Sequence, residues 1–219
     1  TMLNELVARA IAMAKTVPED PYCGIADSGE IAREFPELDL HDSVEPSPEL
    51  LKQRARAAEE SALAVKGITN SEGAEAGWGR ATITLAASNG FAGSYGGSHH
   101  SVSVAVLAGE GTAMERDYDH STAVHGADLE DPAKLGRQAG EKAVRRLNAR
   151  KAATARAPIV FDPRVSRSLL GHLAGAINGA AIARGTSFLK DKLNQRIFSS
   201  DVTVIDDPHR RRGLGSKPF

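Results

Sequence analysis

The sequence predicts an α+β fold, with helices and an antiparallel meander in the N-terminal part and an α/β-like second part. Apolar residues first recur at helical spacing, over residues 2–16 and 48–65. From Gly67 onward they alternate instead, as in a half-buried strand. The dipeptide Asn89-Gly90 then predicts a type I′ hairpin, because both central residues of that turn need positive φ. No glycine-rich phosphate loop follows a strand, so a parallel dinucleotide-binding sheet is not expected.

The composition is that of an ordinary globular protein. The chain has 219 residues, 41% hydrophobic and 25% charged, and no apolar run approaches the roughly 20 residues that span a bilayer. The single cysteine, Cys23, rules out an intrachain disulfide and favours a reducing, cytoplasmic location. The net charge of -1 gives no general attraction for nucleic acid.

The first helix is expected over residues 2–16, where one face is apolar and prolines follow. A long connection rich in Asp, Glu and Pro then reaches Pro48. There Ser47 is a helix cap and Pro48 occupies the first turn of a helix that runs to about Val65.

Three neighbouring strands are expected next, over residues 81–86, 101–107 and 112–118. Tight turns join them, so they form an antiparallel meander. A third helix is expected to start at Asp131-Pro132 and to end near Arg150.

The Ala-rich stretch from Lys151 to Ala157 predicts a domain boundary, with one domain over residues 1–150 and the start of a second over 151–219. The second domain is expected to contain strands at 158–161 and 202–205, and helices at 162–183 and 188–198. The chain opens inside a helical pattern and ends in a segment with glycine and proline. Both ends look cut, so we expect an internal fragment whose second domain is truncated.

Gly171, Gly175 and Gly179 recur every four residues along the helix expected after Asp162. Each glycine inside a helix costs about 1 kcal/mol relative to alanine. Either a neighbouring element packs closely against this face, or a bound peptide or partner chain lies there.

Several segments together resemble a known family. They are Arg184-Gly185-Thr186-Ser187 with the helix before it, and residues 202–207 with Arg211, Arg212 and Gly213 beyond. These are similar to the TldD/PmbA family. Pro18 to Gly24, Asp117-Tyr118-Asp119 and the helix after Asp131-Pro132 resemble its PmbA (TldE) branch. The resemblance implies a cytosolic two-subunit metallopeptidase that acts on unfolded peptides, linked to antitoxin turnover and to modulation of DNA gyrase.

The catalytic branch of that family carries His-Glu-x-x-x-His on the helix before Arg-Gly-Thr-Ser. The corresponding positions here, counted back from Arg184 without a gap, are Leu170, Gly171 and Gly175. None of them can hold a metal or move a proton. The resemblance therefore implies a metal-free subunit, with zinc in a TldD-like catalytic partner, and no catalytic residue in this chain.

The partners expected from the resemblance are that catalytic subunit or a second copy of this chain, together with an extended peptide. Direct binding to nucleic acid or to a membrane is not expected. The residues predicted to contact peptide or partner are Arg184, Gly185, Thr186, Ser187, Gly171, Gly175 and Gly179.

Two other classes of function remain open. The chain could be an active hydrolase that uses His120, His125 and an aspartate, since His99-His100 and Asp117 to His125 hold the potential metal ligands. It could instead be a binding module that modulates a topoisomerase or a toxin system without proteolysis. The pair Asp206-Asp207 is expected to end a strand, and Arg210 to Arg212 to lie in a solvated loop.

Overall fold

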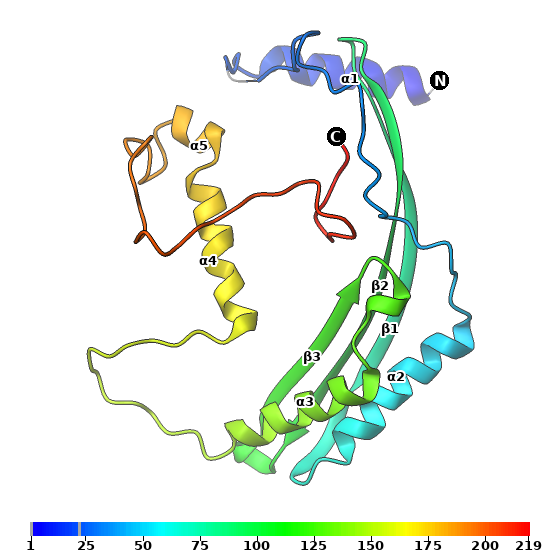
Figure 1. Ribbon diagram of the computed structural model, residues 1–219, viewed down its shortest axis with the longest axis vertical. Coiled ribbons are helices and arrows are strands. Elements are labelled where there is room, and N and C mark those ends of the chain that lie inside the picture. The colour runs from blue at the N-terminus through cyan, green and yellow to red at the C-terminus, as the bar shows by residue number, and fades with distance from the viewer. Residues whose placement is uncertain (1, 22) are drawn as a thin grey trace. The chain divides into compact units, whose positions relative to one another are not determined.

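A computed structural model describes residues 2–21 and 23–219 (Figure 1). Thr1 and Tyr22 lie outside the described residues, and Tyr22 belongs to the Pro18 to Gly24 segment that carries part of the resemblance. The chain packs as two compact units. The helical unit comprises Thr1–Asp27 and Ala155–Val204, and the sheet unit comprises Ser28–Thr154 and Ile205–Phe219. The boundary expected near residue 150 stays a prediction.

The sheet unit contains the expected antiparallel meander, with strands in the order β1-β2-β3. The prediction of an α+β fold is therefore confirmed. The bounds of its elements are α2 (Pro48–Leu63), β1 (Ile68–Ala86), β2 (Ala92–Ala108), β3 (Glu115–Ala123) and α3 (Pro132–Arg146), with 3-10 turns at Gly111–Ala113 and Gly126–Asp128.

Strands β1 and β2 are much longer than the sequence pattern indicates, and they pair without interruption from Ala74 to Ala86. The prediction missed residues 68–80 and 92–100 because they are rich in Gly, Ser, Asn and Glu, which are weak strand formers. Their pairing across the ladder overrides this local preference. The third strand begins three residues later than expected, after the 3-10 turn at Gly111–Ala113.

The hairpin between β1 and β2 lies at Asn89-Gly90 as predicted, but the turn type differs. Among the loop residues only Gly90 has a positive φ, of 93°. The Ala87 amide donates to the Phe91 carbonyl at 3.0 Å, which closes a three-residue loop. Such a loop needs one residue in the left-handed region, and glycine adopts it without steric cost.

The hydrophobic core lies between one face of the sheet and helices α2 and α3 (Figure 1). Alternate residues of β2 supply its sheet side, namely Val102, Val104, Val106 and Ala108. Small residues supply much of the helix side, with Ala58 and Ala62 on α2. Gly136 of α3 lies so close to α2 that a Cβ atom there would overlap the Ala58 carbonyl oxygen. The helices approach each other closely because their facing residues are small.

The predicted starts of α2 and α3 are confirmed. The Ser47 hydroxyl accepts a hydrogen bond from the Leu50 amide at 3.2 Å, and Asp131 accepts one from the Lys134 amide at 2.8 Å. Each cap satisfies an amide that has no partner within its helix.

A segment without helix or strand, which we call the strap (residues 35–44), runs beside β2. The Ser98 amide donates to the Leu40 carbonyl at 2.9 Å, and the Asp42 amide donates to the Ser98 hydroxyl at 2.7 Å. The C-terminal residues return to the strap, where the Arg212 amide donates to the Leu38 carbonyl at 2.8 Å. The Phe219 ring packs against Phe35, with 4.8 Å between the ring centroids.

The helical unit contains α1 (Met2–Thr16), α4 (Pro163–Ala176) and α5 (Gly179–Ala183). The expected helix over 162–183 is thus divided in two. The Asn178 side chain accepts hydrogen bonds from the Ala180 and Ala181 amides, at 3.0 and 3.3 Å, and starts a new helix. An asparagine cap inside an apolar pattern explains why periodicity alone predicted one helix.

The helix expected at 188–198 and the strands expected at 158–161 and 202–205 are absent from the described residues. Residues 188–198 form successive turns instead, and Asn194 has a φ of 58°, which no helix continues through. The two expected strands lie exposed, with Val160 95% and Ile205 78% accessible. A strand requires a neighbour to pair its amides and carbonyls, and no described segment provides one there.

In the described part of the chain no helix combines the length and the apolar character needed to cross a bilayer.

Substituting Gly136→Ala is expected to destabilise the sheet unit by about 1–3 kcal/mol, because the new methyl group overlaps the α2 backbone. Urea denaturation followed by circular dichroism measures this change. Gly175→Ala is the matched control, since a Cβ atom at that helical position meets no described atom within 4 Å outside its own helix. It should cause no loss of stability. Equal losses in both variants would contradict the close packing of α2 and α3.

Candidate functional site

The segment Arg184-Gly185-Thr186-Ser187 ends helix α5 in a tight turn. Gly185 has a φ of 69°, and its amide donates to the Ile182 carbonyl at 3.0 Å. The Thr186 amide reaches back to the Ala181 carbonyl at 3.1 Å. These two bonds form a Schellman motif, which satisfies carbonyls that the helix leaves unpaired. Glycine is the residue best suited to the left-handed position.

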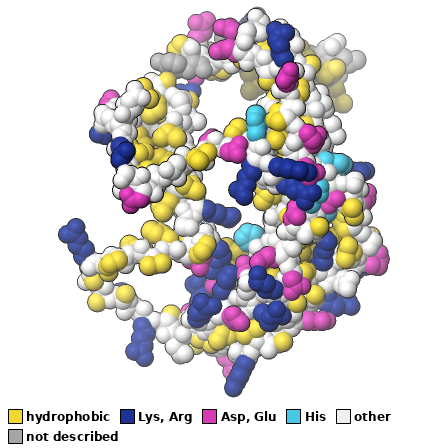
Figure 2. Space-filling model, in the orientation of Figure 1, with side chains coloured by type: hydrophobic (Ala, Val, Ile, Leu, Met, Phe, Trp, Pro, Cys, Tyr) yellow, Lys and Arg dark blue, Asp and Glu magenta, His cyan; other side chains and the backbone are white. Residues whose placement is uncertain are grey.

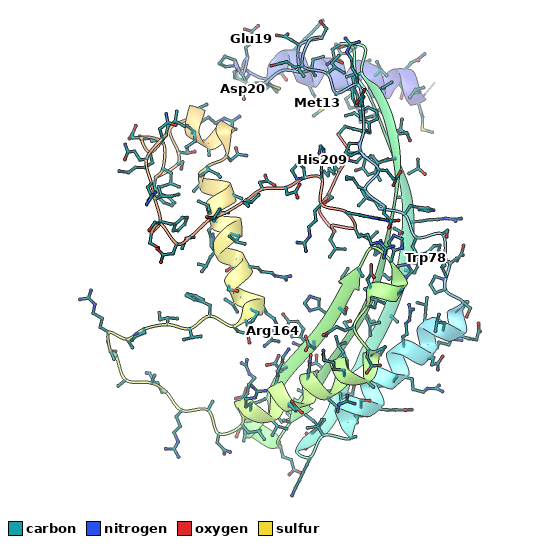
Figure 3. The ribbon with its side chains drawn as sticks, viewed as in Figure 1. Met13, Glu19, Asp20, Trp78, Arg164 and His209 are labelled. Carbon is teal, nitrogen blue, oxygen red and sulfur yellow. The ribbon has the colours of Figure 1, made fainter. Side chains whose placement is uncertain are left out.

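The two hydroxyl groups of this segment hold the turn against both helices. Thr186 Oγ1 donates to the Ala181 carbonyl at 3.2 Å. The buried Ser187 hydroxyl donates to the Ala176 carbonyl of α4 at 2.5 Å and accepts from the Leu189 amide at 3.0 Å. The Arg184 guanidinium pairs at 2.7 Å with Asp20, which follows α1 and is labelled in Figure 3. Each side chain thus has a structural role inside the helical unit, and contact with a peptide or partner stays a prediction.

The three glycines do not share one helix, because Gly171 and Gly175 lie in α4 and Gly179 begins α5. All three are exposed, and apart from the chain neighbours and the helix's own backbone no described atom lies within 4 Å of a Cβ atom built on any of them. Close packing inside this chain therefore does not explain them. Large apolar side chains are also exposed on this part of the chain (Figure 2), among them Leu169, Leu170, Ile177, Phe188 and Leu193.

Leu170, which corresponds to the first motif histidine of the catalytic branch, is 56% exposed on α4, and His172 beside it is exposed too. His172 is the single histidine of α4. A single imidazole does not make a zinc site, which needs three or four ligands.

A second cluster of polar residues joins the strap to the end of the sheet, and two of its members, Asp39 and Asp42, carried no signal in the sequence. Asp42 is buried, and its carboxylate accepts hydrogen bonds from the Gly126 and Val44 amides, both at 2.9 Å. His125 Nε2 lies 3.2 Å from an Asp39 carboxylate oxygen. Arg212 Nε donates to Asp39 at 2.6 Å.

The charges in this cluster are compensated. Hydrogen bonds from the Arg212 and Arg211 guanidinium groups hold the pKa of Asp39 below its usual value. Backbone amides, first that of Gly126, do the same for the pKa of Asp42. Both carboxylates therefore stay ionised and fasten the strap. Asp39 and Arg212 both have positive φ, 52° and 54°, which is uncommon outside glycine and marks a constrained junction.

His100 is the most buried titratable group near the strap, with 1% of its surface exposed. Its Nε2 lies 3.1 Å from an Asp42 carboxylate oxygen, which is within ion-pair distance. Burial lowers the pKa of His100, although Asp42 opposes the shift. Trp78, labelled in Figure 3, pairs with His100 across the ladder and so lies on the helix-covered face, as core residues do.

The structure separates the histidines considered as metal ligands. His99 and His100 point to opposite faces of β2, as adjacent strand residues must. His120 is exposed on β3 and stacks on Tyr118, whereas His125 faces Asp39 and Asp42. Over residues 2–21 and 23–219 no three His, Cys, Asp or Glu side chains gather closely enough to hold a metal ion.

The remaining acidic and basic candidates have structural partners. Asp119 is buried beneath α3 and pairs with Lys142 at 2.5 Å. Asp207 accepts a hydrogen bond from the His209 amide at 3.0 Å, which forms a turn rather than the end of a strand. In the predicted loop, Arg211 and Arg212 bind Asp39, so this basic run fastens the chain to itself.

Comparison with known proteins places both parts of the chain. Residues 41–147 match the model of the PmbA/TldA metallopeptidase central domain, and residues 154–219 match that of the C-terminal domain. The chain is 36% identical to metalloprotease PmbA of Escherichia coli O157:H7 over 97% of its length, and 31% identical to a PmbA homolog of Haemophilus influenzae over 99%. It spans about half of these relatives, 48% of each.

Solved structures agree with this assignment. A protein of Bacteroides thetaiotaomicron, named as a candidate modulator of DNA gyrase, superposes with a TM-score of 0.89 and 28% identity, over 100% of this chain and 51% of that one. A similarly named protein of Thermotoga maritima has a TM-score of 0.78 at 18% identity, covering 86% of this chain and 44% of that chain, which shows the fold alone. The fold is thus that of a metallopeptidase-like family. The chain belongs to the PmbA/TldD metallopeptidase family.

Removing the Ser187 hydroxyl should loosen the α4–α5 turn. Ser187→Ala leaves the Ala176 carbonyl and the Leu189 amide without their partner, at a cost of about 1–3 kcal/mol. Hydrogen exchange of the α5 amides should become faster by the corresponding factor. Ser168→Ala is the control, because that exposed hydroxyl bonds only a carbonyl of its own helix, at 2.7 Å. Unchanged exchange in Ser187→Ala would show that the turn does not depend on this hydroxyl.

Stability should fall as pH is lowered through the range below about 6.5, where a histidine of the unfolded chain becomes protonated. In the folded chain burial keeps the pKa of His100 below that value, so the unfolded state binds more protons there. The loss continues down to the folded pKa. Urea midpoints at pH 7.5 and 5.5 should differ less for His100→Gln than for the native chain. Exposed His99→Gln should retain the native difference, and an equal effect of both variants would exclude His100 as the source.

Proposed function

We propose that this chain is the metal-free subunit of a two-subunit PmbA/TldD-type protease of the cytosol that acts on unfolded peptides. The observation that carries this proposal is the chemistry of α4. The motif positions there are Leu170, Gly171 and Gly175, whose side chains offer no nitrogen, oxygen or sulfur atom. A zinc ion needs such donors, so these residues do not fit the metal that the family name implies.

A subunit without a catalytic centre can still complete the peptide-binding chamber of its partner. The exposed backbone at Gly171 and Gly175 allows another chain to approach α4 without meeting a side chain. The exposed apolar residues nearby, including Leu169 and Leu170, provide hydrophobic area that a partner can bury. We therefore place the contact with a TldD-like catalytic subunit, or with a second copy of this chain, on α4 and on the turn at Arg184 to Ser187.

Extended peptide would be held by main-chain hydrogen bonds. The sheet of the sheet unit has two edge strands, β1 and β3. An edge presents amides and carbonyls that an extended peptide can pair with, whatever its sequence. Sequence-independent pairing suits a subunit that receives many unfolded peptides.

Metal analysis of the protein alone and in complex with a TldD-type catalytic subunit tests this function. We expect no stoichiometric zinc on the protein alone and one zinc per complex, together with peptide hydrolysis only in the complex. Stoichiometric zinc on the isolated protein, lost in His120→Ala or His125→Ala, would instead favour an active hydrolase. A complex whose peptidase activity equals that of the catalytic subunit alone would favour a binding module without proteolysis.

A further inference from the structure

The sheet leaves one stretch of β2 with a neighbour on a single side. Strand β3 ends at Ala123, which lies opposite His100, whereas β2 extends back to Ala92. Residues 92–98 therefore pair with β1 on one edge and have no strand on the other among the described residues. The strap takes the place of β3 only at Ser98, whose amide donates to the Leu40 carbonyl of the strap.

The direction of each β2 amide in this stretch follows from bonds at both ends of the strand. The Phe91 carbonyl accepts from the Ala87 amide, and the Gly109 amide donates to the Gly67 carbonyl. The backbone amides and carbonyls of the odd-numbered residues between them therefore point toward β1. The Ser98 amide faces the strap. The register shows no bulge between Ala92 and Val104. Because amides and carbonyls alternate in direction along an antiparallel strand, those of Ser94 and Gly96 point away from β1.

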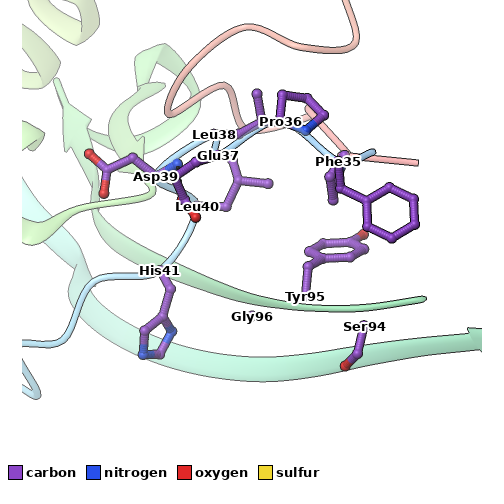
Figure 4. Close-up of a pocket in the computed structure, with 11 residues that line it drawn as sticks. Phe35, Pro36, Glu37, Leu38, Asp39, Leu40, His41, Ser94, Tyr95 and Gly96 are labelled. Atoms are coloured by element: carbon purple, nitrogen blue, oxygen red, sulfur yellow. Dashed lines mark hydrogen bonds between the residues drawn. The ribbon is translucent and has the colours of Figure 1, made fainter. Parts of the chain in front are cut away.

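The strap arches over this open edge and leaves a pocket of about 250 Å³ beneath it (Figure 4). The Ser94 and Gly96 amides have no hydrogen-bond acceptor in the part of the chain that the structure describes. Gly96 has no side chain to fill the space, and the Ser94 hydroxyl is held by Thr84 at 3.0 Å. The rings of Phe35 and Tyr95 lie on one side of the pocket, and His41 lies on the other (Figure 4).

The pocket also carries a carboxylate without a cation. Glu37 lines the pocket, and its carboxylate accepts a hydrogen bond from the Asp39 amide at 2.9 Å. No described Lys, Arg or His side chain lies within ion-pair distance of this carboxylate. Asp39, by contrast, is neutralised by two arginines. A ligand that complements the pocket therefore combines an extended main chain with a positive charge.

We infer that this pocket, the edge slot formed by Phe35, Glu37, His41, Ser94, Tyr95 and Gly96, binds the amino-terminal end of an extended peptide. The peptide pairs with Ser94 and Gly96 as a short added strand, and its ammonium group faces Glu37. The inference rests on the proposed function only in naming peptides as the physiological ligands, and the slot itself lies within the sheet unit.

Hydrogen exchange measured by NMR on the chain with the hexapeptide Lys-Thr-Val-Thr-Val-Thr tests the slot. The Ser94 and Gly96 amides should exchange rapidly in the free chain and become protected when the peptide binds. The Tyr95 and Gly97 amides, which face β1, should be protected in both states. Acetylation of the peptide amino terminus should weaken binding about two- to five-fold, the range of a partly exposed ion pair.

Gly96→Pro removes the amide that faces the slot and should reduce binding more than ten-fold. Proline is tolerated there, because that amide makes no bond to β1. Gly97→Ala is the matched control outside the slot, since its methyl group meets Ile83 at an ordinary 3.9 Å and it should leave binding unchanged. Glu37→Gln should have the same effect as acetylation, whereas Glu75→Gln, an exposed carboxylate outside the slot, should have none.

Two results would overturn the inference, namely native affinity in both Gly96→Pro and Glu37→Gln, or protection confined to amides outside the slot. Neither result depends on metal content, so the slot and the metal-free subunit can fail separately. If the isolated chain carried its own zinc and still bound the peptide in the slot, the inference would stand and the proposed function would fail.

Discussion

The rest of the sheet unit depends on the backbone ladder between β1 and β2. The ladder holds a glycine- and serine-rich sequence in strand conformation. By alternation it turns Val102, Val104 and Val106 toward the helices and Ser101 and Ser103 away. Small residues on α2 and α3 then let two helices cover this single row of valines. Where β3 stops, the ladder loses its third strand. The strap and the returning C-terminal residues cover that end with ion pairs and with the aromatic packing of Phe35 and Phe219.

Elements with a local physical cause could be predicted from the sequence. The starts of α2 and α3 follow from Ser47 and Asp131, and the hairpin follows from Asn89-Gly90. The first half of β1 could not be predicted, because only its partner strand makes Gly, Ser and Asn extended there. The strands expected at 158–161 and 202–205 failed for the converse reason. Their β-branched residues favour extended chain, but no described neighbour pairs with them.

The candidate site divides in the same way. The sequence pointed to the turn after α5 because Arg184 to Ser187 resemble a segment of the TldD/PmbA family. The exposure of Gly171 and Gly175 agrees with an approach from outside the chain, although spacing alone also permitted internal packing. Asp39, Asp42 and the open edge at Gly96 carried no local signal. They come together only because residues 35–44, 94–100, 125 and 212 meet in the fold, far apart in sequence.

The outer edge of β1 is unpaired along its length among the described residues, and such an edge invites association with other chains. The composition of β1 works against this outcome. Gly73, Gly77 and Gly79 weaken the strand, and Glu72 and Glu75 place negative charge along it. Poor strand-forming residues therefore protect solubility here, while β2 maintains the conformation. Replacing them with Val or Ile would strengthen the sheet, but it would also create an edge prone to aggregation.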